Sequence, residues 1–170
     1  VISCQNVSGT ASSDGMAAKS AFGRKGTGIS DMRMVSKSVE ETIEIGERLG
    51  RKLGPGDVVA LIGDLGSGKT VLTKGIAKGL GVKNERYVNS PTFVIIKEYK
   101  GRTPLYHFDL YRLDSSSVLD LEAYEEYFYG KGVSVVEWAD KIRGALPPKR
   151  IEVKLAVSGE GKRRIDISKL

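Results

Sequence analysis

Eight consecutive residues, Gly63 to Thr70, have the types and spacing needed to bind a phosphate chain. Their sequence, GDLGSGKT, matches the pattern G-x-x-x-x-G-K-S/T, in which glycines let the backbone wrap closely around a phosphate. Backbone N–H groups and the N-terminus of the following helix then bind the anion. Lys69 would neutralise charge on the β and γ phosphates, and the Thr70 hydroxyl would ligate Mg²⁺. The pattern predicts a site for a nucleoside triphosphate and Mg²⁺ made of Gly63, Asp64, Leu65, Gly66, Ser67, Gly68, Lys69 and Thr70.

A chance match is the alternative, because the chain contains 21 glycines. The surrounding sequence argues against it. Val58 to Ile62 is a continuous apolar run, which is typical of a parallel strand buried on both faces. A helical pattern follows from Lys69 to about Leu80, with Gly81 in a C-cap position. A strand, this loop and a helix in that order are the context in which the motif binds phosphate.

A carboxylate must also lie near the Mg²⁺ ion, usually at the end of a neighbouring strand. Glu137 follows the apolar run 133–136, so it should lie at the carboxyl edge of a sheet, where ligands of open α/β sheets bind. Glu137 is therefore one candidate for the carboxylate near Mg²⁺. An ordinary strand-end charge in solvent is the competing interpretation.

Asp109 is a second candidate carboxylate, within the predicted strand 105–110. Alternation places His107, Asp109 and Tyr111 on one face, and such a polar trio is either exposed or lines a site. Asp109 could orient or deprotonate the attacking water, or hold a Mg²⁺-bound water. The spacing alone leaves this role open. His107 suits a hydrogen-bonding scaffold better than catalysis, because phosphoryl transfer needs little acid–base chemistry.

The segment Ser90-Pro91-Thr92 follows the phosphate-loop helix. Its two hydroxyls could reach Mg²⁺ or the γ-phosphate, as nucleotide-sensing segments do. An ordinary turn before a strand explains the same residues, and spacing alone favours that simpler interpretation.

These residues need an α/β framework to bring them together. We expect a single domain with the P-loop NTPase fold over residues 32–170, with a mixed sheet that has a parallel centre and antiparallel additions and is flanked by helices. Residues 1–31 are rich in Ser, Gly, Ala and Thr, so we interpret them as disordered or as an extension added by cloning. Ser38 and Glu41 form a capping-box pattern opening a helix whose apolar stripe is Val39, Ile43, Leu49 and Leu53.

The remaining elements follow from periodicity and turn residues. A short strand is expected near 34–35, further strands at 94–99 and 105–110 joined as a hairpin, and a buried strand at 133–136. Helices are expected at 114–129 and 139–146, and a last hairpin pairs 151–157 with 164–167.

Composition narrows the possible functions. The chain has 170 residues with one cysteine and one histidine, which excludes an intrachain disulfide, a cysteine metal cluster and a multi-histidine metal site. No apolar run approaches the roughly 20 residues that span a bilayer, so we expect a cytoplasmic protein without membrane contact. The net charge of +6 could serve RNA or an acidic partner, or could be a solvated basic face.

Four motifs together resemble the TsaE (YjeE) family of bacterial P-loop ATPases. They are Gly63 to Thr70, Ser90-Pro91-Thr92-Phe93, His107-Phe108-Asp109-Leu110-Tyr111-Arg112 and Val136-Glu137-Trp138. The resemblance runs from about Val35 to Val157. It implies a role in forming N6-threonylcarbamoyladenosine (t6A) at position 37 of tRNA, with ATP and Mg²⁺ bound and ATP hydrolysed slowly. It also implies TsaD and TsaB as partners, with TsaD as the transferase that this protein supports or resets, and with tRNA contact through the complex.

The resemblance also implies roles for individual residues. Lys69 would bind phosphate, Thr70 and Glu137 would hold Mg²⁺, and Asp109 would support hydrolysis. Lys69, Asp109 and Glu137 are thus the expected catalytic set. Thr92 would belong to a switch-like loop, and Thr42 near Ser38 would help to enclose the adenine.

Other functions remain as alternatives. A small-molecule or nucleoside kinase could use the same loop, although no arginine-rich lid is evident in the middle of the chain. A GTPase lacks support, because no N-K-x-D signature occurs. A non-catalytic RNA-binding module would explain the basic C-terminal segment but not the phosphate loop with its carboxylates.

Overall fold

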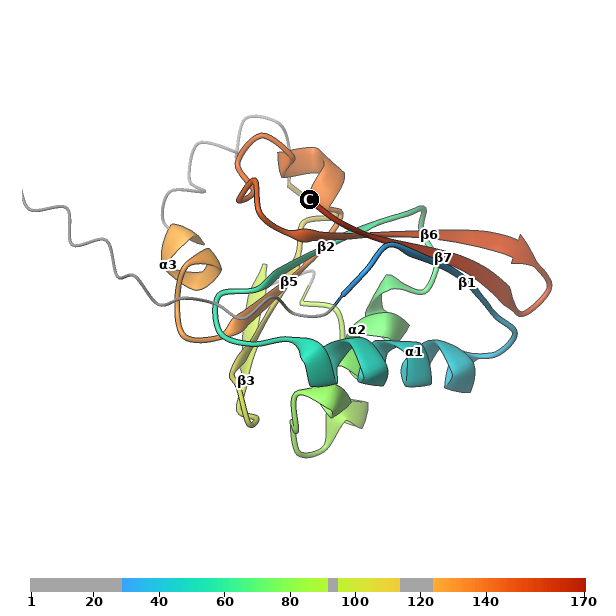
Figure 1. Cartoon of the computed structure of the whole chain (residues 1–170), viewed down its shortest axis with the longest axis horizontal. Coiled ribbons are helices and arrows are strands. Elements are labelled where there is room, and N and C mark those ends of the chain that lie inside the picture. Colours follow the sequence, from blue (N-terminus) through green and yellow to red (C-terminus); the bar gives the residue numbers. More distant parts are fainter. Residues whose placement is uncertain (1–28, 92–94, 114–123) are drawn as a thin grey trace, which may run out of the picture.

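A computed structural model describes residues 29–91, 95–113 and 124–170 of the chain. Within these ranges seven strands form one sheet in the order β1-β7-β6-β2-β5-β4-β3. Strands β6, β2, β5 and β4 run parallel, whereas β3, β7 and β1 are added antiparallel at the two sides. This is the predicted mixed sheet with a parallel centre, seen across the middle of Figure 1. The strands are β1 (Met32–Ser36), β2 (Val58–Ile62), β3 (Ile96–Tyr99), β4 (Leu105–Asp109), β5 (Val133–Glu137), β6 (Ile151–Gly159) and β7 (Lys162–Lys169).

Helices cover both faces of the sheet. The α-helices in the described ranges are α1 (Val39–Lys52), α2 (Lys69–Gly79) and α3 (Glu125–Phe128), and the 3-10 helices are η1 (Glu85–Tyr87) and η3 (Ala139–Ile142). Strand β2 alternates between two apolar layers. Val59 and Leu61 face the layer of α1 and α2, whereas Val58 and Ala60 face the layer that contains Phe128 and Ile142.

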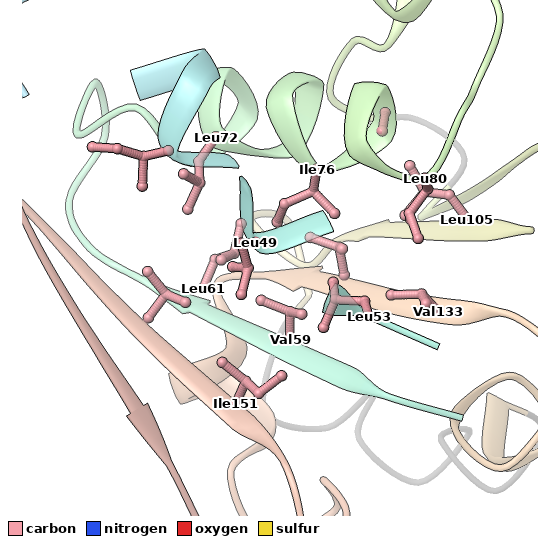
Figure 2. Packing of buried hydrophobic residues seen from close by; sticks show 14 of the residues in the cluster. Leu49, Leu53, Val59, Leu61, Leu72, Ile76, Leu80, Leu105, Val133 and Ile151 are labelled. Carbon is pink, nitrogen blue, oxygen red and sulfur yellow. The ribbon is translucent and has the colours of Figure 1, made fainter. Parts of the chain in front are cut away.

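The larger core lies under α1 and α2. Figure 2 shows leucine and isoleucine side chains of these helices, such as Leu49 and Ile76, packed against Val59 and Leu61 of β2. These side chains are almost completely buried. At roughly 1.5–3 kcal/mol for each fully buried aliphatic side chain, this layer supplies much of the driving force that holds the helices on the sheet. Among the described residues, none of the helices has the length and hydrophobicity of a membrane-spanning segment.

Most predicted elements are confirmed, with longer strands at the C-terminal hairpin. Helix α2 ends as predicted, because Gly81 adopts a φ of 76° and its N–H donates to the Lys78 carbonyl at 3.0 Å. Of the predicted helix 114–129, only α3 and its neighbours lie within the described residues. The predicted helix 139–146 is wrong in type and length, since only the 3-10 helix Ala139–Ile142 forms there.

Two further differences concern the N-terminal part. Residues 29–31, which we assigned to the extension, belong to the domain: Ile29 is buried in the larger core, and Asp31 accepts the Lys169 N–H at 3.1 Å. Val39 does not continue the buried stripe of α1, because it is 56% exposed. The buried face of α1 instead includes Gly46 and Gly50.

Four glycines bring α1 and α2 together at backbone distance. A Cβ on Gly46 would lie 2.4 Å from the Leu72 carbonyl oxygen, and one on Gly50 would lie 2.3 Å from that of Ile76. From the other side, Cβ atoms on Gly75 and Gly79 would lie 2.2 and 2.3 Å from carbonyl oxygens of α1. The helices can therefore approach this closely only because these four positions carry no side chain.

We predict that Gly50→Ala lowers the free energy of unfolding by about 1–3 kcal/mol, as overpacking of a tight contact does. The clash outweighs the gain of about 1 kcal/mol in helix propensity. Urea denaturation measures the change. Gly54→Ala is the control, because a Cβ there would meet nothing within 4 Å. A Gly50→Ala protein more stable than the wild type would contradict the close approach of the helices.

Candidate functional site

The carboxyl ends of three neighbouring parallel strands meet at one edge of the sheet. In the register, Leu61 of β2 lies beside Glu137 of β5, and Glu137 lies beside Asp109 of β4. The phosphate loop leaves β2 at this edge. A cleft of about 390 Å³ opens there, lined by Ser38, Val39, Thr42, Leu65, Gly66, Gly68, Lys69, Thr70, Val71, Ser90, Asp109, Tyr111, Glu137, Trp138, Gly161 and Arg163.

Lys69 begins α2 and is held on three sides. Its ammonium group donates to the carbonyl oxygens of Gly63 at 2.6 Å and Asp64 at 2.9 Å, and it lies 3.8 Å from the centre of the Trp138 ring. Burial lowers the pKa of Lys69 from its ordinary value of 10.5, and nearby carboxylates, Glu137 first and then Asp109, act in the opposite sense. A partly desolvated cation of this kind attracts an incoming anion more strongly than a fully hydrated cation does.

The backbone makes these positions possible. Gly68, the residue before α2, adopts a φ of 103°, which a side chain would disfavour. Trp138, directly after β5, has a φ of 59°, which is unusual for a bulky residue. With this backbone conformation the Trp138 ring lies near both Lys69 and Tyr111, and the Tyr111 ring centre is 5.1 Å away.

Glu137 connects the phosphate-loop helix to the sheet. One carboxylate oxygen, Oε2, accepts the Thr70 hydroxyl at 3.0 Å, and the other, Oε1, lies 2.8 Å from Nε2 of His107. Glu137 is only 2% exposed. The interpretation of Glu137 as a solvent-exposed strand-end charge is therefore wrong.

Both carboxylate oxygens of Asp109 accept hydrogen bonds. Its Oδ2 accepts the Ser90 hydroxyl, and its Oδ1 accepts the Tyr111 N–H at 2.9 Å. Asp109 is 5% exposed and lines the cleft beside Glu137. Ser90 thus links the segment before β3 to the end of β4.

The β6–β7 hairpin and the start of α1 form the opposite wall. Arg163 of β7 reaches the phosphate loop and donates to the Gly66 carbonyl at 3.4 Å. Thr42 of α1 is fixed by its hydroxyl, which lies 2.8 Å from the Ser36 hydroxyl and donates to the Ser38 carbonyl at 3.0 Å. Ser38 caps α1 by accepting the Glu41 N–H at 3.2 Å, as the capping-box pattern predicts.

The structure brings most of the predicted site residues to this cleft: Leu65, Gly66, Gly68, Lys69, Thr70, Thr42, Asp109 and Glu137. Three phosphate-loop residues do not line it. Gly63 and Asp64 supply the carbonyls that hold Lys69, and Ser67 is buried. Thr92 lies outside the described residues.

Two features differ from what the sequence suggests. The polar face of β4 is partly interior, since His107 is completely buried rather than exposed or lining the cleft. Arg163 was not predicted as a site residue. Its alternation with the buried Ile165 and Ile167 was the available signal, because it places an arginine at the end of an apolar row.

The donor set fits a hard divalent cation such as Mg²⁺. No cluster of three or more histidine, cysteine, aspartate or glutamate side chains that could hold a metal occurs among the described residues. The hydroxyl of Thr70 and the carboxylate of Glu137 are hard oxygen donors on neighbouring elements. Mg²⁺ is commonly held by one or two carboxylates together with the phosphates of a nucleotide.

A buried strand, this glycine-rich loop and the helix that starts at its lysine define a P-loop protein. Residues 36–165 match the family model described as "Threonylcarbamoyl adenosine biosynthesis protein TsaE". The chain belongs to the TsaE family.

Individual relatives agree. The tRNA threonylcarbamoyladenosine biosynthesis protein TsaE of Bacillus subtilis is 50% identical over 128 residues, which are 74% of this chain and 78% of the relative. That of Treponema pallidum is 42% identical over 138 residues, covering 81% of this chain and the whole relative. The crystal structure of Bacillus subtilis YdiB matches with a TM-score of 0.68 and 39% identity, covering 81% of this chain and 84% of that one.

The Thr70–Glu137 contact can be tested without any ligand. We predict that Thr70→Val, which keeps the shape but removes the hydroxyl, lowers the free energy of unfolding by about 1–3 kcal/mol because a buried carboxylate oxygen loses its donor. Thr70→Ser keeps the donor and should lose less. Thermal or urea denaturation without nucleotide measures both variants. Equal losses would show that the hydrogen bond contributes nothing to stability.

Proposed function

We propose that this protein binds ATP and Mg²⁺ at the cleft and hydrolyses ATP slowly until partners complete the site. We further propose that it supports t6A37 formation in tRNA by assisting or resetting a transferase of the TsaD–TsaB type, in the cytoplasm. The observation that carries the proposal is the contact of 3.0 Å between Thr70 of the phosphate loop and Glu137 at the strand edge. Membership of the TsaE family supports the pathway, because the relatives carry the name of t6A biosynthesis proteins.

The phosphate chain would lie along the start of α2. Its negative charge would meet Lys69, the backbone N–H groups of the loop and the positive end of the helix dipole. Thr70 and Glu137 would hold Mg²⁺, which neutralises charge that develops on the phosphates. Thr42 of α1 and Arg163 of the β6–β7 hairpin line the same cleft, so they would face the rest of the nucleotide.

The position of Asp109 supports the proposal of slow turnover without partners. Both of its carboxylate oxygens already accept hydrogen bonds, from Ser90 and from the Tyr111 backbone. An attacking water would compete with these two donors for the Asp109 oxygens. A partner that moves the Ser90 segment would release Asp109 for that role, which is a switch of the order-and-release type.

The decisive experiment measures ATP hydrolysis by the purified chain, alone and with TsaD and TsaB. We expect stimulation by the partners, and a loss of about 100-fold or more in Lys69→Ala and Glu137→Ala, as when one preorganised charge-stabilising group is removed. Lys74→Ala is the control, since Lys74 lies on the same helix but outside the cleft lining. No partner effect, together with phosphate transfer to an added small-molecule acceptor, would favour a kinase instead.

Arg163 provides a second test of where the nucleotide lies. We predict that Arg163→Ala weakens ATP binding about tenfold, the effect of losing roughly 1.4 kcal/mol from one charge-assisted hydrogen bond. Arg164→Ala is the matched control, because Arg164 pairs with Asp166 at 3.2 Å and does not line the cleft. Titration with a fluorescent ATP analogue measures both. Equal weakening in the two variants would indicate a general charge effect and not a contact.

A further inference from the structure

His107 has no part in the function proposed above, yet burying its polar ring costs free energy of hydration. It is completely buried in β4, and a buried polar ring must be hydrogen-bonded to offset its lost hydration. Nδ1 makes no hydrogen bond with any described residue. Nε2, by contrast, lies 2.8 Å from Oε1 of Glu137. Among the described residues, the ring therefore hydrogen-bonds only with Glu137.

The direction of this hydrogen bond is fixed by its partners. A carboxylate oxygen can only accept, so the hydrogen must lie on Nε2 of His107. His107 pairs with Val135 in the sheet, two residues before Glu137 on the same face of β5. The ring therefore approaches the carboxylate from the interior side. Oε2, the other oxygen, is left to meet Thr70 at the cleft.

We propose that His107 is a positioning residue, which holds Glu137 so that Oε2 faces the divalent cation. The inference rests on the proposed function, in which Glu137 and Thr70 hold Mg²⁺. Without the His107 hydrogen bond, the carboxylate could rotate about its side-chain torsions, and ordering it would then oppose metal binding. Partners that hydrogen-bond a metal ligand from behind commonly contribute 10- to 100-fold to metal affinity.

The test measures the Mg²⁺ concentration that half-maximally tightens the binding of a fluorescent ADP analogue, so it does not depend on turnover. In His107→Leu we expect this concentration to rise about 10- to 100-fold. His107→Gln should stay within a few-fold of the wild type, because its amide nitrogen can occupy the place of Nε2 and donate. Ser134→Ala is the control: Ser134 is as buried, but its hydroxyl donates to the Tyr127 carbonyl at 2.8 Å, away from Glu137.

A double variant separates positioning from packing. If His107 acts through Glu137, His107→Leu adds no further loss of Mg²⁺ dependence in a Glu137→Ala background. A residue that only fills space would still show its own effect there. Should His107→Leu fail to fold, His107→Asn replaces it. Asparagine is too short to place its amide nitrogen at Nε2, so it should raise the required Mg²⁺ concentration where His107→Gln does not.

The outcomes distinguish the two proposals. A wild-type protein whose ADP affinity does not respond to Mg²⁺ overturns the proposed Mg²⁺ site, and the role of His107 with it. A wild-type response that is unchanged in folded His107→Leu or His107→Asn overturns the positioning role alone. A weakened response in these variants, restored by His107→Gln, supports it.

Discussion

The close packing of α1 against α2 is the constraint on which the site depends. Because Gly46, Gly50, Gly75 and Gly79 allow the two backbones to touch, the helices form one unit over the sheet. The N-terminus of each helix then points to the same cleft: α2 delivers the phosphate loop, and α1 delivers its first turn with Thr42. A wider helix pair would still bury leucines, but it would separate the two walls that face a nucleotide. The close packing of the two helices therefore also sets the distance between the two walls of the cleft.

The second constraint is charge. Lys69 lies among Glu137, Asp109, Asp140 and Asp64, all of which favour its charged form, whereas burial opposes that form. The two carboxylates at the strand edge are in turn hydrogen-bonded, Glu137 with Thr70 and His107, and Asp109 with Ser90 and the Tyr111 N–H. Such a network is stable only while every member is paired. An incoming phosphate and cation would exchange partners within it, and would not have to be buried as isolated charges.

Sequence reasoning found the parts of this site that are encoded locally. The phosphate loop is contiguous, and Glu137 and Asp109 are located by the rule that ligands bind at the carboxyl ends of parallel strands. Features that depend on packing between distant segments were missed. Alternation gives the face of His107 but not whether that face is covered. The apolar stripe of α1 was wrong at Val39, which lines the cleft and is exposed. The contact of α1 with α2 instead uses glycines, which no apolar pattern reveals. Alternation gives the face of Arg163, but its contact with the loop depends on the register of the β6–β7 hairpin, which no local pattern specifies.

Glu137 shows how one side chain can join stability to function. In the structure its Oε1 is directed toward the interior by His107 and its Oε2 toward the loop by Thr70. The hydrogen bond between Thr70 and Oε2 keeps the site in place without a ligand. The Thr70 hydroxyl oxygen and Oε2 of Glu137 are also the pair that would hold Mg²⁺. Metal binding would therefore replace this hydrogen bond, while the interior bond to His107 could persist. A carboxylate held at one oxygen and exchangeable at the other loses little conformational entropy when the cation arrives, which is the physical advantage of preorganisation.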